Sequence, residues 1–174
     1  IRNESPISRV KYVNSNSILS DNVQNQVFKK FIDFVERMLL FYSLDSRGYE
    51  GFMNGSESIA EGIVNSGKVK DFQEFLKEND IDYELYGCEV DGRKAIYCHF
   101  DNKDADFFKI ASTGTRSLAL FYYWYIRMEK ASFVFIDEFD AFYHYELSES
   151  VQKRLRRISD VQVFTTTHNT DLMS

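Results

Sequence analysis

The chain has 174 residues, of which 44% are hydrophobic and 16% aromatic, and it contains a single proline. This composition predicts one ordered domain, or a fragment of one, and excludes a disordered tail or linker. A net charge of -6 argues against a surface that grips nucleic acid over its whole extent. The sequence shows neither a membrane-spanning apolar run nor a leader pattern, so we expect a cytoplasmic protein without a membrane anchor.

The first predicted element is a long amphipathic helix. Asp21 and Gln24 are placed like a capping box in front of it. Apolar residues then recur at helical spacing, at Val23, Val27, Phe31, Phe34, Met38 and Phe41.

The middle of the chain predicts two short helices after a loop. The stretch 47–55 carries three glycines and is typical of a loop, and a helix over 56–65 follows. Gly67 interrupts the pattern, and a second helix, over 69–79, resumes it.

The segment 81–100 is rich in β-branched and aromatic residues around Asp91-Gly92, a pair that favours a tight hairpin turn. Positions that face each other across a two-residue turn sum to the same number, which gives Glu89–Lys94, Cys88–Ala95 and Leu85–Cys98. The two cysteines then point to opposite faces, so this register excludes a disulfide between them and fits a reducing compartment.

From residue 110 onward the pattern alternates between helices and strands. A loop is followed by a helix over 116–128, a strand over 133–136, a helix over 145–158 and a strand over 161–166. This alternation indicates βαβ units and a parallel sheet, and hence an α/β fold.

Two acids follow the strand over 133–136. The run Phe133-Val134-Phe135-Ile136 does not alternate, which favours a strand buried on both faces, and it ends in Asp137-Glu138. In ATPases such a strand tip lets one acid hold the shell of magnesium (Mg2+) while the next polarises the attacking water. The simpler interpretation is a strand that ends in solvated acids.

The segment from Ser112 to Arg116 precedes the apolar helix. Ser112 is placed to cap this helix, and the amide of Gly114 then points outward with the positive end of the helix dipole, which favours an anion. Arg116 in the first turn opposes the dipole unless a phosphate or carboxylate lies nearby. The alternative is an ordinary capped helix with a solvated arginine.

His168 follows the run of β-branched residues that ends in Thr165-Thr166-Thr167, so it too stands at the carboxyl end of a predicted strand. A lone histidine there is more often structural. A functional role for His168 is favoured because the capped glycine loop, the strand with two acids and the histidine follow one another in a fixed order.

These segments together resemble the prokaryotic ABC-related AAA family of ATP-binding proteins, relatives of the overcoming-lysogenisation-defect and chromosome-maintenance heads. The signature corresponds to Ser112–Leu118, the Walker B strand to Phe133–Glu138, and the switch-histidine segment to Thr166–Leu172. The segment 68–100 also resembles the region before the signature. Where the family often has a Leu-His pair after Walker B, this chain has Tyr143-His144.

The resemblance implies an ABC-type P-loop NTPase head that binds and hydrolyses ATP as a dimer. Glu138 would be the catalytic base, His168 the sensor of the γ-phosphate, and Asp137 a residue that helps to hold Mg2+. The signature residues would contact the γ-phosphate of ATP bound by a second subunit; they are Ser112, Gly114, Thr115 and Arg116.

The phosphate loop GxxxxGK[ST] that such a head needs is not complete in this sequence. The stretch Gly62 to Lys68 comes close, but Val69 lacks the hydroxyl for magnesium, and we interpret the stretch as a break between helices. We therefore expect the true loop upstream of Ile1, residues 1–110 to form a helical and β-hairpin insert region, and residues 111–174 to form the second half of the head.

Two other functions stay open at the level of sequence. A degenerate head would bind or regulate a partner through the hairpin and the aromatic run Tyr122-Tyr123-Trp124-Tyr125, although a helix buried on several sides also explains that run. A transporter subunit is the third option. An effector domain or nucleic acid would be engaged through the longer protein.

Overall fold

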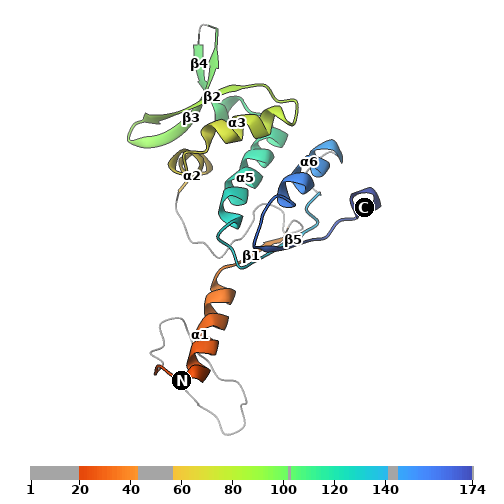
Figure 1. Ribbon diagram of the computed structural model, residues 1–174. Helices are drawn as coiled ribbons and strands as arrows, with labels where there is room; N and C mark the ends of the chain where they lie inside the picture. The colour runs from red at the N-terminus through yellow and green to blue at the C-terminus, as the bar shows by residue number, and fades with distance from the viewer. Residues whose placement is uncertain (1–19, 43–56, 102, 141–144, 174) are drawn as a thin grey trace.

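A computed structural model describes residues 20–42, 57–101, 103–140 and 145–173. Within these ranges the chain forms two three-stranded sheets, and the long helix α5 (Thr113–Met128) extends from one to the other (Figure 1). The predicted loop over 47–55 and the pair Tyr143-His144 lie outside the described residues.

Helix α1 (Val23–Glu36) is shorter than its sequence pattern predicts. Its cap is Asn22, whose side chain accepts the amide of Asn25 at 2.8 Å, and not the predicted capping box at Asp21 and Gln24. The prediction of a helix as far as Phe41 is wrong, because strand β1 (Met38–Tyr42) follows directly. An apolar run of this length suits either structure, and pairing with a neighbouring strand decides it.

The first sheet is parallel, as predicted, and has the order β1-β5-β6. Strand β5 (Phe133–Asp137) lies in the middle, between β1 and β6 (Gln162–Thr165). Its residue Ile136 is paired with Phe41 of β1 on one side and with Thr165 of β6 on the other. Burial alternates along β5, because Val134 and Ile136 are buried while Phe133 and Phe135 are half-buried. The prediction that β5 is fully buried on both faces is therefore wrong.

The second sheet is antiparallel and contains the predicted hairpin, formed by β2 (Glu84–Val90) and β3 (Arg93–Phe100). Asp91 and Gly92 have φ angles of 50° and 74°, the left-handed values that a tight turn of this kind requires. All three predicted cross-strand pairs are confirmed: Glu89–Lys94, Cys88–Ala95 and Leu85–Cys98. A third strand, β4 (Lys103–Asp106), pairs with β3 and was not predicted.

Of the remaining helices, the three longer ones agree with the predicted ranges to within a few residues, and the two of four residues each were not predicted. Their bounds are α2 (Ile59–Asn65), α3 (Val69–Lys77), the short α4 (Phe107–Ile110), α6 (Tyr145–Leu155) and the 3-10 turn η1 (Thr170–Met173). Ser58 and Glu61 form a capping box in front of α2. Gly67 stands between α2 and α3 with a φ of 69°, which confirms the predicted helix break.

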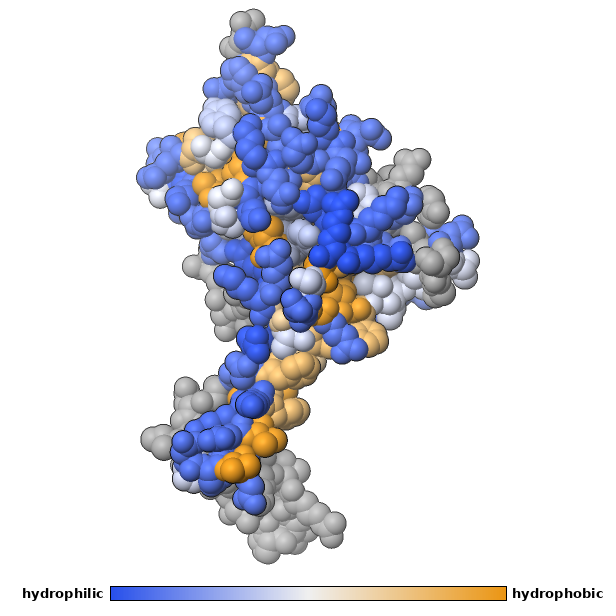
Figure 2. Space-filling model, viewed as in Figure 1, coloured by the Kyte–Doolittle hydropathy of each residue, from blue (hydrophilic) through white to orange (hydrophobic). Residues whose placement is uncertain are grey.

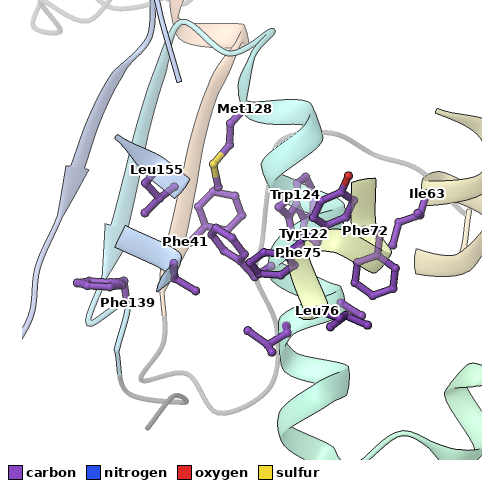
Figure 3. Close-up of a cluster of buried hydrophobic side chains, with 14 of the residues drawn as sticks. Phe41, Ile63, Phe72, Phe75, Leu76, Tyr122, Trp124, Met128, Phe139 and Leu155 are labelled. Atoms are coloured by element: carbon purple, nitrogen blue, oxygen red, sulfur yellow. The ribbon is translucent and has the colours of Figure 1, made fainter. Parts of the chain in front are cut away.

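The core follows α5 and is dominated by aromatic rings (Figure 3). Trp124 lies edge-on to Phe41 of the parallel sheet at a centroid distance of 5.5 Å, and Tyr122 packs on Phe72 and Phe75 of α3 at 5.0 and 5.5 Å. The aromatic run of α5 is therefore a helix buried on several sides. This removes the support that the sequence offered for an aromatic interaction surface there.

Helix α1 projects away from this core (Figure 1) and carries apolar side chains on its surface (Figure 2). Val23 and Val27 are 76% and 65% exposed, and Phe31 and Phe34 are 58% and 41% exposed. Packing against the described residues therefore contributes little to the stability of this helix.

Candidate functional site

The carboxyl end of β5 carries the two acids that the sequence singled out. Asp137 is the last residue of the strand, and Glu138 follows it with a φ of 45°. This left-handed conformation is rare for a residue with a side chain and ends the strand abruptly. Both acids consequently stand at the tip of the central strand.

Thr166 follows the last residue of β6 and ties both acids to that strand. Its hydroxyl donates to Oδ1 of Asp137 at 2.6 Å and accepts the amide of Glu138 at 2.7 Å. The amide of Thr166 donates to the carbonyl of Ile136 at 3.0 Å, and the amide of Phe139 donates to the carbonyl of Thr166 at 3.1 Å. Thr166 lies in the predicted histidine segment, but no local pattern indicates a role for it, because its position beside the acids depends on the strand register.

His168 lies beside Glu138, with Nε2 of the ring 2.7 Å from Oε1 of the carboxylate. The glutamate side chain is 17% exposed, whereas the histidine side chain is 87% exposed. An Nε2–H group would donate to the carboxylate and orient it. The structure thus brings together two residues, 30 positions apart in sequence, for which the family resemblance implies the roles of base and γ-phosphate sensor.

Ser112 caps α5, as predicted. Its hydroxyl accepts the amide of Thr115 at 3.1 Å and lies 2.8 Å from the Thr115 hydroxyl, and its carbonyl accepts the amide of Arg116 at 2.9 Å. The side chain of Thr115 is buried, so its hydroxyl holds the capping serine in place. Of the four residues predicted to bind nucleotide, Thr115 is buried in the protein, whereas Ser112, Gly114 and Arg116 are exposed.

Gly114 and Arg116 face solvent at the start of α5. A Cβ at Gly114 would meet nothing closer than the Ser112 hydroxyl, at 3.9 Å, so the space in front of this turn is open. The guanidinium of Arg116 donates through Nε to the carbonyl of Ala111 at 3.0 Å, which holds the side chain close to the loop. A positive helix end and an arginine therefore share one open surface.

The capped loop and the strand tips form two separate groups. Within the described ranges, no hydrogen bond or ion pair joins the residues Ser112, Gly114 and Arg116 to Asp137 or His168.

An ionic network around one buried arginine, which the sequence did not suggest, connects α6 to α3 and α5. Arg154 is 5% exposed and donates to Asp71 at 2.9 Å and to Glu78 at 3.1 Å. The hydroxyl of Tyr122 also donates to Asp71. Burial first, and this bond second, raise the pKa of Tyr122 well above its usual range.

Three further observations concern bound groups and membranes. Gly62 lies inside α2 and is buried, so the stretch from Gly62 to Lys68 is no phosphate loop. Among the described residues, no cluster of three or more acids, histidines or cysteines could hold a metal ion by itself. No described helix is long and apolar enough to cross a membrane.

Comparison with known protein families gives a match over most of the chain. The model of the family described as "AAA domain, putative AbiEii toxin, Type IV TA system" matches residues 11–174. A search of the curated proteins found no match. The matched range includes the capped loop, the strand with two acids and the switch-histidine segment, together with both sheets. The chain therefore belongs to this AAA-domain family, whose members are P-loop nucleotide-binding proteins of the ATPase class.

Proposed function

We propose that this chain supplies the hydrolytic and closing half of an ATP site in an ABC-type head that works as a dimer. The observation that carries the proposal is the contact of 2.7 Å between His168 and Glu138 at the tips of two adjacent parallel strands. Ligand sites of open parallel sheets lie at this edge. Family membership supports ATP as the substrate.

The acids at the strand tip suit magnesium. In ATPases, Mg2+ is usually held by one or two carboxylates together with water and phosphate oxygens, so a cage of three acids is not needed. Oδ1 of Asp137 is engaged by Thr166, while the part of the chain described here offers Oδ2 no hydrogen-bond partner. Asp137 would therefore hold the ion through Oδ2, and the bound ion would neutralise charge on the phosphates.

Glu138 would act as the general base. Its side chain is largely buried but remains accessible to solvent. The contact with His168 orients Oε1 of the carboxylate. Oε2 would accept the proton of a water molecule as that water attacks phosphorus. His168, which is largely exposed, would hold the carboxylate and contact the terminal phosphate when nucleotide is present.

The loop at Ser112 would act on the site of a second subunit. Its separation from Asp137 and Glu138 and the open space in front of Gly114 favour this arrangement. Arg116 and the first amides of α5 would stabilise negative charge on the phosphate from the opposite side. In this proposal residues 111–174 form the catalytic part, residues 1–110 the insert region, and an effector domain or nucleic acid is engaged elsewhere in the protein.

The test of hydrolysis is Glu138→Gln in the protein expressed from the complete gene. Turnover should fall by about 100-fold or more, because proton transfer by a positioned base contributes about 10²–10⁴-fold. ATP binding should persist. Glu129→Gln changes an exposed glutamate at the end of α5 and serves as the matched control. Unchanged turnover in the Glu138 variant would refute the assignment.

The test of the dimer uses a mixture. Arg116→Ala and Glu138→Gln should each be inactive as homodimers. A mixed dimer would contain one site that combines an intact Glu138 from one chain with an intact Arg116 from the other, so mixing should restore part of the activity. No recovery after subunit exchange would contradict an action of Arg116 on the partner's site.

A further inference from the structure

Within the described ranges, Thr166 is the one side chain that bonds both acids of the strand tip. Its hydroxyl donates its proton to the Asp137 carboxylate at 2.6 Å and, through a lone pair, accepts the Glu138 amide at 2.7 Å. A hydrogen bond to an ionised carboxylate is stronger than one between neutral groups. One oxygen atom therefore fixes the position of one acid and the backbone of the next.

The backbone of Glu138 needs such a contact. Its φ of 45° lies in the left-handed region, which a residue with a Cβ adopts at a cost and which persists only when surrounding contacts maintain it. The hydroxyl of Thr166 accepts the amide of this same residue. Loss of the hydroxyl would leave the amide without that acceptor and allow Glu138 to relax toward ordinary backbone angles.

The hydroxyl is not needed to pair the strands. The amide of Thr166 already bonds the Ile136 carbonyl, and its own carbonyl accepts the amide of Phe139. These backbone contacts do not depend on the side chain, so a change at the side chain of Thr166 separates the geometry of the acids from the pairing of β5 and β6.

We propose that Thr166 is a positioning residue that sets the orientation of Asp137 and the left-handed turn at Glu138 through a single hydroxyl. This inference rests on the proposed hydrolytic role of the two acids. Thr166 does not itself take part in proton transfer; it keeps one acid directed at the metal and the other at the water.

The first experiment measures amide hydrogen exchange in the nucleotide-free, complete protein, with fragmentation that resolves single residues. Thr166→Val keeps the shape of the side chain and removes its hydroxyl. Exchange at Glu138 should become about tenfold faster or more, as expected for the loss of one hydrogen bond to a partly buried group. Exchange at Phe139, whose acceptor is a backbone carbonyl, should stay slow and serves as the internal folding control.

The second experiment measures steady-state ATP hydrolysis. Thr166→Val should lower kcat about 10- to 100-fold, the usual effect of removing a group that orients a metal-binding carboxylate, with KM for ATP near the wild-type value. Thr166→Ser keeps the hydroxyl and should retain most of the activity. The matched control is Thr165→Val, which makes the same chemical change one position earlier in β6.

The outcomes separate this inference from the proposed function. Unchanged exchange at Glu138 in Thr166→Val, or an equal loss of kcat in Thr165→Val, would overturn the positioning role. A wild-type rate in Glu138→Gln would instead overturn the hydrolytic role, and the exchange experiment would still report the contact, because it uses no nucleotide. Retained activity in Thr166→Ser, together with fast exchange at Glu138 in Thr166→Val, would support both the positioning role and the hydrolytic role.

Discussion

The guanidinium of Arg154 donates to the carboxylate of Asp71 at 2.9 Å and so joins α6 to α3 across 83 positions of sequence. The same guanidinium lies over the rings of Phe75 and Tyr125, at 4.9 and 5.2 Å from their centroids. Helix α6 precedes β6, and Thr166 and His168 follow that strand. The network therefore links α6, the helix that leads into β6, to α3.

Replacement of Arg154 by methionine should destabilise the fold by about 2 kcal/mol. Removing one partner of a buried pair costs about 3–5 kcal/mol, and the value is reduced here because Asp71 and Glu78 keep 44% and 46% of their side-chain surface. Urea unfolding measures the change. Lys153→Met removes an exposed pair with Glu149 and should stay within about 0.5 kcal/mol of wild type. Equal losses in both variants would contradict a special role for the buried arginine.

Two glycine-to-alanine variants should behave in opposite ways. A Cβ at Gly62 would overlap the ring of Tyr123 and the guanidinium of Arg127, so Gly62→Ala should cost about 1–3 kcal/mol of stability. Gly114→Ala has room and should leave stability unchanged or raise it by up to about 1 kcal/mol. If Gly114 meets a partner's nucleotide, its variant should still lose ATPase activity. A stable and fully active Gly114→Ala would argue against that contact.

The pair of His99 and Asp104 on the second sheet predicts a pH effect. The side-chain hydrogen bond with Asp104 raises the pKa of His99 above 6.5, and the bond with His99 lowers the pKa of Asp104 below 3.8. The contribution of the histidine to stability is thus complete below pH 6.5 and is lost as pH rises through its raised pKa. That of the aspartate is present above pH 3.8 and is lost as pH falls through its lowered pKa.

Asp104→Asn should return the pKa of His99 toward 6.5, as measured by NMR titration of the ring. The same change should lower the pKa of Tyr86, which the hydrogen bond with Asp104 raises to about 12. Asp101→Asn serves as the control, because Asp101 contributes less to the His99 shift than Asp104 does. A large shift in the control with none in Asp104→Asn would show that the pair does not form.

The two cysteines should react at different rates with a thiol reagent. Burial raises the pKa of Cys98 to about 11, and it raises that of the half-buried Cys88 as well. Because the thiolate is the reactive form, mass spectrometry should detect modification at Cys88 first and at Cys98 only as the sheet opens. In denaturant both should react at similar rates. Faster labelling of Cys98 in the native protein would contradict the observed register.

Local sequence patterns were enough to predict most elements with short-range causes. The turn at Asp91-Gly92 follows from two residues that tolerate left-handed angles, and the cap at Ser112 from one hydroxyl in front of a helix. Strand β1 was missed because its apolar run continues the helical spacing of α1 past Glu36. Only its partner β5, about 95 residues later in the sequence, decides between helix and strand.

The residues of the candidate site likewise fall into those that local sequence patterns indicate and those that only long-range contacts reveal. Asp137 and Glu138 could be named from a strand that ends in acids, and His168 from its place after a second strand. The roles of Thr166 and Arg154 depend on contacts between segments far apart in the chain. A threonine after a β-branched run and an arginine near a helix end carry no local signal that distinguishes them from solvated residues.

The three consecutive threonines from 165 to 167 give the site a form of redundancy. In the observed register Ile136 faces Thr165, so Thr166 stands beside Asp137. If β6 slipped by one position in either direction, another threonine would occupy that place and could offer a hydroxyl to the same acid. His168 has no such substitute, since a slip would move its ring away from Glu138. A strand shifted by one position would keep a threonine beside Asp137 but lose the contact between His168 and Glu138, so this contact reports whether the two strands are aligned.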